Sequence, residues 1–332
     1  MKVSGSILAT DGNYLEYAKE LKKAKIDYLH IDIFQDSKCF RLDNLYEFDD
    51  SYLPLDVHLI FSHITEKNIN ILNDVKAEFL NIQYESLVDK DEIRFVSRRF
   101  NGKFGIAVTA ETSLDIIDKY IEDVSQVLIM CSTPGVSGAK FNEENFERVE
   151  KIRNKYPSLK IIVDGGVNKE IGKAMGELGA DILVSGSYLC KDMLSLTRHG
   201  YYLKYMNESN INVKRNMLSF NELPIVNRDE IFMNIILTMN KYRLGLVFDV
   251  EGQELCGIIS DGEVRRNLIK YNEDIFYAKA SQLMNENPFC VDSEMCLEEV
   301  YDKLFETRRG IDVVPIIDSG MLIGALDLHM GK

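Results

Sequence analysis

Residues 27–34 read DYLHIDIF, an apolar run of strand length that also contains His30 and Asp32. Successive side chains of a strand point to opposite faces, so Tyr28, His30 and Asp32 would share one face. A buried carboxylate is unfavourable unless it is paired or binds a metal. His30 and Asp32 are therefore either core residues whose polar groups are all hydrogen-bonded, or half of a functional site.

Seven further apolar runs of similar length lie between residues 3 and 187, and amphipathic stretches separate most of them. The eight expected strands are 3–8, 27–34, 55–61, 78–84, 104–109, 126–130, 159–166 and 181–187. Alternating strands and helices indicate parallel βα units, and eight such units close a TIM barrel. An open doubly wound sheet is the alternative, although it would need more length or fewer units. The helical pattern is weakest after the second strand.

The composition is that of a globular protein, with 332 residues, of which 45% are hydrophobic and 28% charged. This length predicts two domains. The net charge of −14 and the absence of a Lys/Arg-rich block argue against nucleic acid or an anionic membrane as partner. The six cysteines lack the spacing of a zinc site or a disulfide framework. The N-terminal apolar stretch is too short for a signal peptide, and no apolar run approaches the ~18 residues of a membrane span. We expect a cytoplasmic protein.

The polar residues of the predicted barrel fall at strand ends, where barrel enzymes gather their functional groups. His30 and Asp32 close the second strand, His58 lies in the third, and Asp164 closes the seventh. Two histidines and two aspartates suit zinc, and also Mn, Fe(II) or Co. Two carboxylates beside a metal suit removal of a proton next to a carbonyl and its return to the opposite face. The pattern therefore predicts an epimerisation.

Glycine-rich turns follow the sixth, seventh and eighth strands, at 134–138, 165–166 and 186–187. Glycine lets the backbone approach a ligand closely, and free N–H groups at such turns bind phosphate. The loops after strands seven and eight form the common phosphate site of TIM barrels. We therefore expect a phosphorylated substrate.

Six segments in this order resemble the ribulose-phosphate 3-epimerase family: SILATD (6–11), LHIDI (29–33), DVHLI (56–60), VLIMCSTPGVSGAKF (127–141), VDGGVN (163–168) and VSGSYL (184–189). The resemblance implies that one divalent metal per barrel, zinc in the first instance, is bound by His30, Asp32, His58 and Asp164. It implies that Asp32 and Asp164 are the catalytic acid/base pair. The substrate-binding residues that it implies are Ser6, His58, Met130, Gly135, Val136, Ser137, Gly138, Gly165, Gly166, Gly186 and Ser187.

The activity implied is inversion of C3 in D-ribulose 5-phosphate, giving D-xylulose 5-phosphate through a metal-stabilised enediolate. The residues around the substrate depart from the family pattern. Phe34 and Gln35 replace a methionine and an aspartate, Ile60 replaces a methionine, and Gln83 replaces a histidine. The phosphate loop at 135–139 reads Gly-Val-Ser-Gly-Ala instead of Gly-Phe-Gly-Gly-Gln. The reaction class is thus retained while the substrate could be a longer sugar phosphate.

The second half contains a repeat of about 65 residues in which Pro224 aligns with Pro288 and Gly257 with Gly324. Each copy predicts a helix, two short strands and a turn. The repeat resembles a tandem CBS-domain pair, and GIISDGEVRR and GALDLH are similar to segments of arabinose-5-phosphate isomerases. The expected domains are a barrel at 1–206, a linker at 207–216, and a CBS pair at 217–332 with repeats 217–280 and 281–332.

CBS pairs generally bind nucleotides or dimerise, so the resemblance implies a nucleotide or nucleotide-sugar effector, or a homo-oligomer. The nucleotide motif is represented by Gly257, Ser260 and Glu263, where Glu263 replaces the usual aspartate. Arg265 and Arg266 either offset the negative charge there or form the solvated face of a helix.

The leading hypothesis is a metal-dependent ketose-phosphate 3-epimerase with a CBS module for regulation or assembly. The alternatives are an epimerase of a longer sugar phosphate in a surface-polysaccharide pathway, a related phosphosugar lyase or decarboxylase, and a non-catalytic sugar-phosphate or nucleotide sensor.

Overall fold

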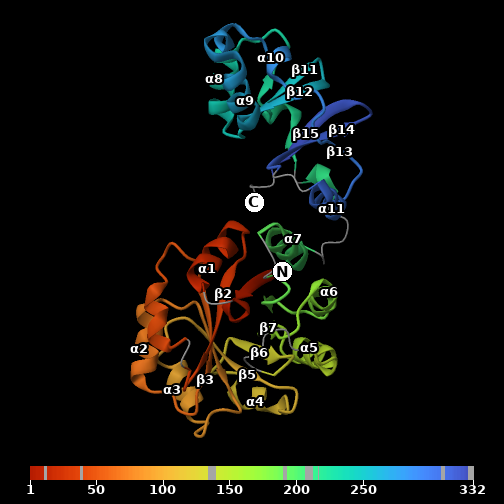
Figure 1. Cartoon of the computed structure of the whole chain (residues 1–332). Coiled ribbons are helices and arrows are strands. Elements are labelled where there is room, and N and C mark those ends of the chain that lie inside the picture. Colours follow the sequence, from red (N-terminus) through yellow and green to blue (C-terminus); the bar gives the residue numbers. More distant parts are fainter. Residues whose placement is uncertain are drawn as a thin grey trace. The chain divides into compact units, whose positions relative to one another are not determined.

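The computed structural model describes residues 1–10, 13–37, 40–133, 140–189, 193–205, 212–215, 217–307 and 311–327. The chain forms two compact units, Met1–Ser209 and Asn210–Lys332 (Figure 1). Each unit has its own hydrophobic core.

The first unit is a closed barrel of eight parallel strands, because β1 pairs with β8 as well as with β2. This confirms the predicted TIM-type barrel. The strands are β1 (Lys2–Ser6), β2 (Tyr28–Phe34), β3 (Leu55–Ile60), β4 (Phe79–Gln83), β5 (Lys103–Val108), β6 (Gln126–Met130), β7 (Lys160–Asp164) and β8 (Ile182–Ser185).

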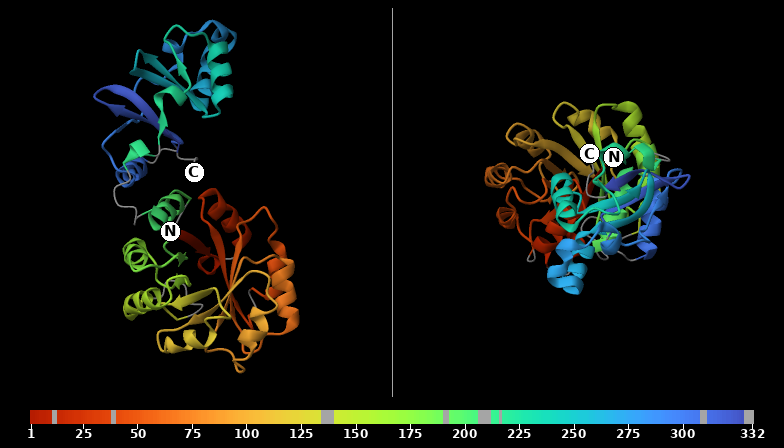
Figure 2. Two further views of the ribbon diagram at one scale, coloured as in Figure 1. Left: turned by 180° about the vertical axis from the view of Figure 1, so that it is seen from behind. Right: turned by 90° about the horizontal axis from the view of Figure 1, so that it is seen from above.

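Helices follow the strands and surround the barrel, as the views in Figure 2 show. They are α1 (Tyr14–Lys23), α2 (Glu66–Asp74), α3 (Glu92–Ser97), α4 (Asp115–Tyr120), α5 (Glu144–Lys155), α6 (Lys169–Glu177) and α7 (Met193–Tyr205). The segment after β2 forms only a 3₁₀ helix, η2 (Leu42–Glu47), in agreement with its weak helical pattern. Strand β1 ends earlier than expected because the Ser6 hydroxyl accepts a hydrogen bond from the Leu8 N–H and starts the 3₁₀ helix η1 (Ile7–Ala9).

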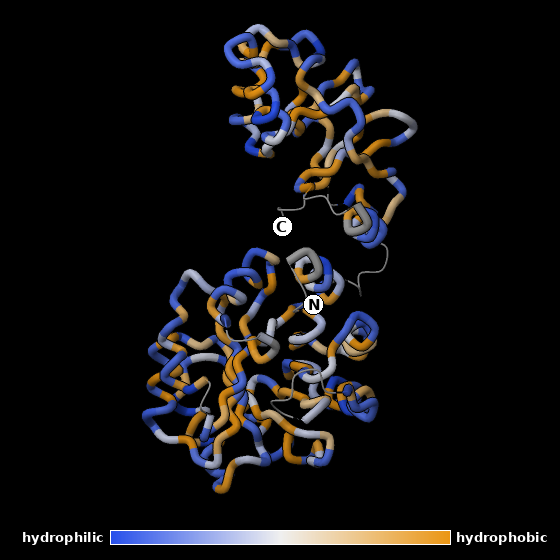
Figure 3. Tube along the Cα trace, in the orientation of Figure 1, coloured by the Kyte–Doolittle hydropathy of each residue, from blue (hydrophilic) through white to orange (hydrophobic). Residues whose placement is uncertain are grey.

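The alternation predicted for β2 sorts its side chains into two layers. Leu29, Ile31 and Ile33 are fully buried in the core between strands and helices. The barrel interior has a separate apolar cluster, which includes Phe79 and Met130 and against which Tyr28 packs. The strands of the barrel are predominantly hydrophobic in Figure 3. His30 and Asp32, which share a face with Tyr28, are therefore enclosed within the barrel.

The second unit is built on one sheet with the strand order β10-β11-β12-β15-β14-β13, and β9 pairs with β15. Its strands are β9 (Leu218–Ser219), β10 (Ile225–Val226), β11 (Leu246–Glu251), β12 (Glu254–Ser260), β13 (Val291–Asp292), β14 (Val313–Asp318) and β15 (Met321–Asp327). Its helices are η3 (Val213–Arg215), η4 (Phe220–Glu222), α8 (Phe232–Tyr242), α9 (Asp261–Tyr271), η5 (Asn272–Tyr277), α10 (Ala280–Leu283) and α11 (Leu297–Thr307).

The internal repeat is visible in this topology, since α8-β11-β12 corresponds to α11-β14-β15. The strand register repeats as well: Asp249 lies opposite Gly257, and Ile316 lies opposite Gly324. This confirms the predicted tandem α+β repeat. Within the described ranges, the helices are all too short or too polar to cross a membrane.

Candidate metal centre

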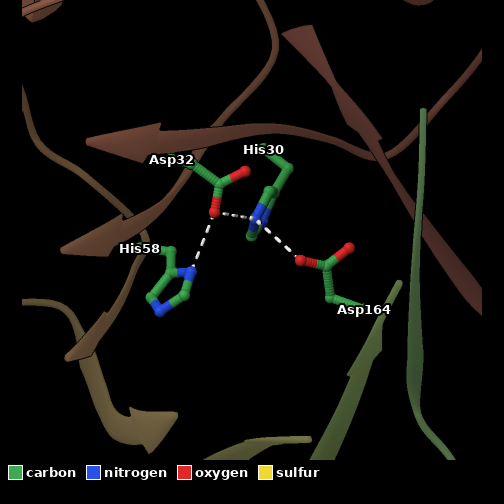
Figure 4. Close-up of side chains that lie close together, drawn as sticks. All are labelled: His30, Asp32, His58 and Asp164. Carbon is green, nitrogen blue, oxygen red and sulfur yellow. Dashed lines mark hydrogen bonds and ion pairs between the residues drawn. The ribbon is translucent and has the colours of Figure 1, made fainter. Parts of the chain in front are cut away.

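The four predicted metal ligands come together at one end of the barrel interior (Figure 4). Each of His30, Asp32, His58 and Asp164 offers one ligand atom, and these atoms lie within 4.8 Å of one another. Strand register explains the arrangement on β2 and β3, because Asp32 lies directly opposite His58. Both histidines are fully buried, whereas the Asp164 side chain retains 16% of its exposure.

His30 is oriented by a second carboxylate that lies opposite it on β3. Its Nδ1 is 2.8 Å from Oδ2 of Asp56, which also accepts a hydrogen bond from the Ser4 hydroxyl at 2.9 Å. Within the part of the chain that the structure describes, the Nε2 atom has no hydrogen-bond partner. It lies 3.5 Å from Oδ1 of Asp32 and 3.8 Å from Oδ2 of Asp164. A buried ring nitrogen without a partner, facing two carboxylates, fits a site for a divalent cation.

His58 is held on both sides of its ring. Nδ1 lies 2.8 Å from Oδ1 of Asp32, and Nε2 lies 2.8 Å from Oε1 of Gln83 at the end of β4. All four ligands are thus fixed by strands, and the histidines are fixed further by Asp56 and Gln83. A preformed group of this kind is suited to binding a metal with little rearrangement.

The two carboxylates of the site differ in acidity. Burial raises the pKa of Asp164 to about 6, and the charge of Asp32 adds to the effect although His30 opposes it. Burial also acts to raise the pKa of Asp32, but His30 and His58 beside it lower that pKa well below its usual range. The pKa of His30 is raised because the charges of Asp56 and Asp32 outweigh the effect of burial. One carboxylate is therefore firmly ionised, and the other can carry a proton near neutral pH.

A pocket opens beside this group. It is lined by Ser6, Leu8, Asp32, Met130, Ser132, Thr133, Asp164, Gly165, Gly166, Val167, Val184, Ser185, Gly186 and Ser187. The pocket thus brings both carboxylates together with six of the predicted substrate-binding residues. Gly135, Val136, Ser137 and Gly138 lie outside the described residues.

The turn after β7 requires its glycines. Gly165 and Gly166 have φ values of +109° and +68°. A Cβ atom on Gly165 would lie 2.3 Å from the Ser132 hydroxyl oxygen, and one on Gly166 would lie 2.8 Å from the backbone N of Phe141. The backbone at the pocket therefore packs directly against the loop after β6.

Three of the residues that depart from the family pattern, Phe34, Gln35 and Ile60, lie next to one another at the ends of β2 and β3. Phe34 and Ile60 are paired across the two strands. Oε1 of Gln35 accepts hydrogen bonds from the backbone N–H and the hydroxyl of Ser62, at 2.8 and 2.7 Å. Gln35 thereby ties together the loops that follow the two strands.

Sequence reasoning did not assign roles to Asp56 or Gln83 beside the two histidines. Asp56 precedes His58 by two residues and therefore shares its face of β3, which is a signal that the pattern contained. The contact between Gln83 and His58 follows from the pairing of β3 with β4, and the local sequence of either strand does not show it.

The three residues of the predicted nucleotide motif lie near the start of α9. Ser260 is the N-cap of this helix, and its hydroxyl accepts a hydrogen bond from the Glu263 N–H while the Glu263 carboxylate accepts one from the Ser260 N–H. Glu263 also forms an ion pair with Arg266, whose side chain is 69% exposed. A Cβ atom on Gly257 would lie 2.7 Å from the carbonyl oxygen of Asn285. Each of these residues therefore has a structural role, and their nucleotide binding stays a prediction.

The remaining described histidines lie outside the metal centre. His63 is on the surface, with Nδ1 2.9 Å from a carboxylate oxygen of Glu92. His199 stacks on Tyr188 at 4.1 Å between ring centroids. His329 lies outside the described residues.

Comparison with known proteins finds relatives of the first unit. Residues 2–190 match the model of the ribulose-phosphate 3 epimerase family. The chain is 28% identical to ribulose-phosphate 3-epimerase of Schizosaccharomyces pombe over 199 residues, which cover 56% of this chain and 85% of the relative. The corresponding enzyme of Helicobacter pylori is 29% identical over 203 residues, covering 58% and 91%. An uncharacterized protein of Rickettsia prowazekii is 38% identical over 119 residues, which make up 35% of each chain.

Among solved structures, the CBS-pair protein CBSX2 from Arabidopsis thaliana is similar to 36% of this chain. The similarity covers 90% of that protein, with 19% identity and a TM-score of 0.32.

Proposed function

Because the chain belongs to the ribulose-phosphate 3-epimerase family over residues 2–190, we propose that it inverts C3 of a ketose phosphate in a metal-dependent reaction. D-ribulose 5-phosphate is the substrate that we propose first. The observation that carries this proposal is the pair Asp32 and Asp164, which line one pocket and flank the unpartnered Nε2 of His30.

The divalent cation would be held by His30, Asp32, His58 and Asp164, with zinc as the first candidate because the set combines imidazole and carboxylate ligands. When bound, the cation would stabilise the negative charge that develops on the substrate oxygen during proton removal.

The two carboxylates would move the proton. One ionised carboxylate removes the proton from C3 on one face of the planar intermediate, and the other, in its protonated form, donates a proton to the opposite face. Their protonation states are exchanged after one turnover, so the reverse reaction uses the opposite assignment. The separation of their pKa values, with Asp32 low and Asp164 at about 6, supports this division of roles.

The phosphate group of the substrate would bind at the glycine turns after β7 and β8. Gly165, Gly166, Gly186 and Ser187 line the pocket next to the carboxylates. Small residues expose backbone N–H groups, which are suited to phosphate oxygens.

For the second unit we propose regulation or assembly. A nucleotide or nucleotide-sugar at Ser260 and Glu263 would have to displace the hydrogen bonds that these residues form with each other. Thermal unfolding with AMP, ATP and nucleotide-sugars tests ligand binding, because a ligand of the folded state raises the melting temperature. The cytoplasmic location and the homo-oligomer also stay predictions.

The proposed activity is tested with metal-loaded protein and D-ribulose 5-phosphate in deuterated water. We expect NMR to show deuterium at C3 and the appearance of D-xylulose 5-phosphate. Asp32→Asn and Asp164→Asn should each abolish turnover, since general acid–base catalysis contributes about 10²–10⁴-fold and each group is needed once per cycle.

The alternatives give different results in the same experiment. Exchange only with a longer ketose phosphate would retain the reaction and change the substrate, as the altered pair Phe34 and Ile60 allows. Stoichiometric metal without exchange on any ketose phosphate would contradict the epimerase and favour a sugar-phosphate sensor.

A further inference from the structure

We propose that Gln83, anchored by Glu85, is a positioning residue that fixes which ring nitrogen of His58 faces the metal-binding group. The inference deepens the proposed function and rests on its metal site. Gln83 and Glu85 are not among the proposed metal ligands. The inference predicts which ring nitrogen of His58 binds the metal, and activity measurements do not report this property.

The direction of the Gln83 amide follows from its neighbours. The side chain is buried at the end of β4, and its Nε2 lies 2.5 Å from Oε2 of Glu85 and 3.5 Å from the carbonyl oxygen of Ala107. Both neighbours are acceptors, so the NH₂ group must face them. The amide oxygen Oε1 therefore faces Nε2 of His58 at 2.8 Å.

This direction determines the tautomer of His58. An amide oxygen can only accept a hydrogen bond, so the proton of the ring must be on Nε2. In the neutral ring, Nδ1 then directs its lone pair toward Oδ1 of Asp32, 2.8 Å away. Two electron-rich atoms at this separation are stabilised by a cation that both of them ligate. Gln83 thus selects Nδ1 as the ligand atom of His58.

Glu85 in turn is fixed at the rim of the barrel. Its Oε1 accepts hydrogen bonds from the N–H and the hydroxyl of Thr109, at 3.0 and 3.2 Å, and from the hydroxyl of Thr112. The guanidinium group of Arg148 donates to the carbonyl oxygens of Thr109 and Thr112 at 3.0 and 2.9 Å and so holds the same loop. A continuous set of hydrogen bonds therefore links α5 to the buried ring of His58.

His30 has the opposite arrangement. Its Nδ1 lies 2.8 Å from the Asp56 carboxylate, which can only accept, so Nε2 is the atom left for the metal. The two histidines must therefore coordinate through different nitrogens, and this difference can be measured directly.

The first experiment uses the full chain, labelled with ¹⁵N-histidine and loaded with ¹¹³Cd²⁺. Long-range ¹H–¹⁵N spectra and ¹¹³Cd–¹⁵N couplings should show one histidine bound through Nε2 and one through Nδ1, with a proton on Nε2 of the latter. A His58→Gln variant assigns the two signals. Coordination of His58 through Nε2 would overturn the inference.

The second experiment changes Gln83. Gln83→Leu removes the acceptor and should weaken Cd²⁺ and Zn²⁺ binding by about 10- to 100-fold, as is usual for the partner of a ligating histidine. Gln83→His, which again offers one donor and one acceptor nitrogen, should recover most of that loss. Asn145→Leu is the matched control, because it removes another fully buried amide of the first unit, which donates to the carbonyl oxygen of Asn142, and should leave the affinity unchanged.

The outcomes separate this inference from the proposed function. Failure of the unaltered protein to bind one equivalent of metal would end both. Stoichiometric binding that Gln83→Leu leaves unchanged, or that Asn145→Leu weakens equally, would overturn the positioning role alone.

Discussion

Asp56 in the first unit and Asp249 in the second are both buried within a strand, and the two residues have opposite surroundings. Asp56 of β3 is fully buried and interacts with His30, Ser4 and Asn81. Asp249 of β11 is equally buried, yet among the described residues neither of its carboxylate oxygens has a hydrogen-bond partner. The corresponding position of the second repeat is Ile316.

The surroundings of Asp56 and Asp249 show that burying a carboxylate can have two different effects on stability. In the barrel, the carboxylate is satisfied and orients a metal ligand, so its desolvation is offset by polar contacts. In the second unit, burial raises the pKa of Asp249, and Asp229 adds to the effect while Arg228 opposes it. Asp56 should therefore stabilise its unit, and Asp249 should destabilise its own.

The largest effect is expected on removing Asp56. Asp56→Leu would leave His30, the Ser4 hydroxyl and the Asn81 amide without their buried acceptor, and should cost about 3–5 kcal/mol of stability. Urea unfolding measures this loss. Asp56→Asn keeps one acceptor oxygen and should lose less; equal losses in the two variants would contradict the assigned role.

The next effect concerns metal affinity and pH. With a pKa of about 6 in the metal-free protein, Asp164 holds a proton below that pH, and a metal must displace it. His30, whose pKa is raised, must also lose a proton to bind the metal through Nε2. The apparent affinity should therefore fall by about tenfold per pH unit where His30 alone is protonated, and by about 100-fold per unit below pH 6, where Asp164 is protonated as well. Competition titrations between pH 5 and 7 test this. Asp32 should add nothing to the pH dependence of the metal affinity in this range, because its pKa is low.

Replacing Asp249 should raise the stability of the second unit, whereas replacing Asp56 should lower the stability of the barrel. Asp249→Val removes an unsatisfied buried carboxylate and should stabilise the second unit by about 1–3 kcal/mol at pH 7. Hydrogen exchange of the amides in β11 and β12 reports this unit separately from the barrel. A loss of protection in the variant would show that Asp249 has a partner that compensates its burial.

The stability gained in Asp249→Val should also depend on pH. Because the pKa of Asp249 is raised above its unfolded value of 3.8, its contribution to stability is most favourable below that value and is lost as pH rises through the folded pKa. The advantage of Asp249→Val should therefore shrink as the pH is lowered from 7 to 4. A constant difference over this range would mean that packing and not charge is responsible.

The smallest effect is expected at the surface. His63 pairs with Glu92 but is 57% exposed, so His63→Gln should change stability by less than about 0.5 kcal/mol and leave metal affinity unaltered. A measurable loss of metal would place His63 in the site and contradict the structure.

The sequence predicted the barrel well because each strand is a compact apolar run, and each ligand lies within such a run or, for Asp164, at its end. His30, Asp32, His58 and Asp164 all lie where the strand pattern placed them. The partners of the histidines were not predicted, because the pairs of His30 with Asp56 and of His58 with Gln83 depend on contacts between strands.

In the second unit, the same motif supports two interpretations. Ser260 and Glu263 have the spacing of a nucleotide motif, and this spacing is also that of a helix capping box, which the structure contains. Local sequence cannot separate the two, because both need a hydroxyl followed three residues later by an acidic group.

Closure of the barrel through β1 and β8 also constrains how the protein is made. The first three metal ligands are synthesised by residue 58, but Asp164 follows more than a hundred residues later, and the partner strand of β1 ends only at Ser185. At roughly 5–20 residues per second, the ribosome needs several seconds to deliver them. During that interval the nascent chain carries an open sheet edge and an incomplete ligand set. Chaperone contact is therefore expected to matter most before β8 has left the ribosome, and metal loading after it.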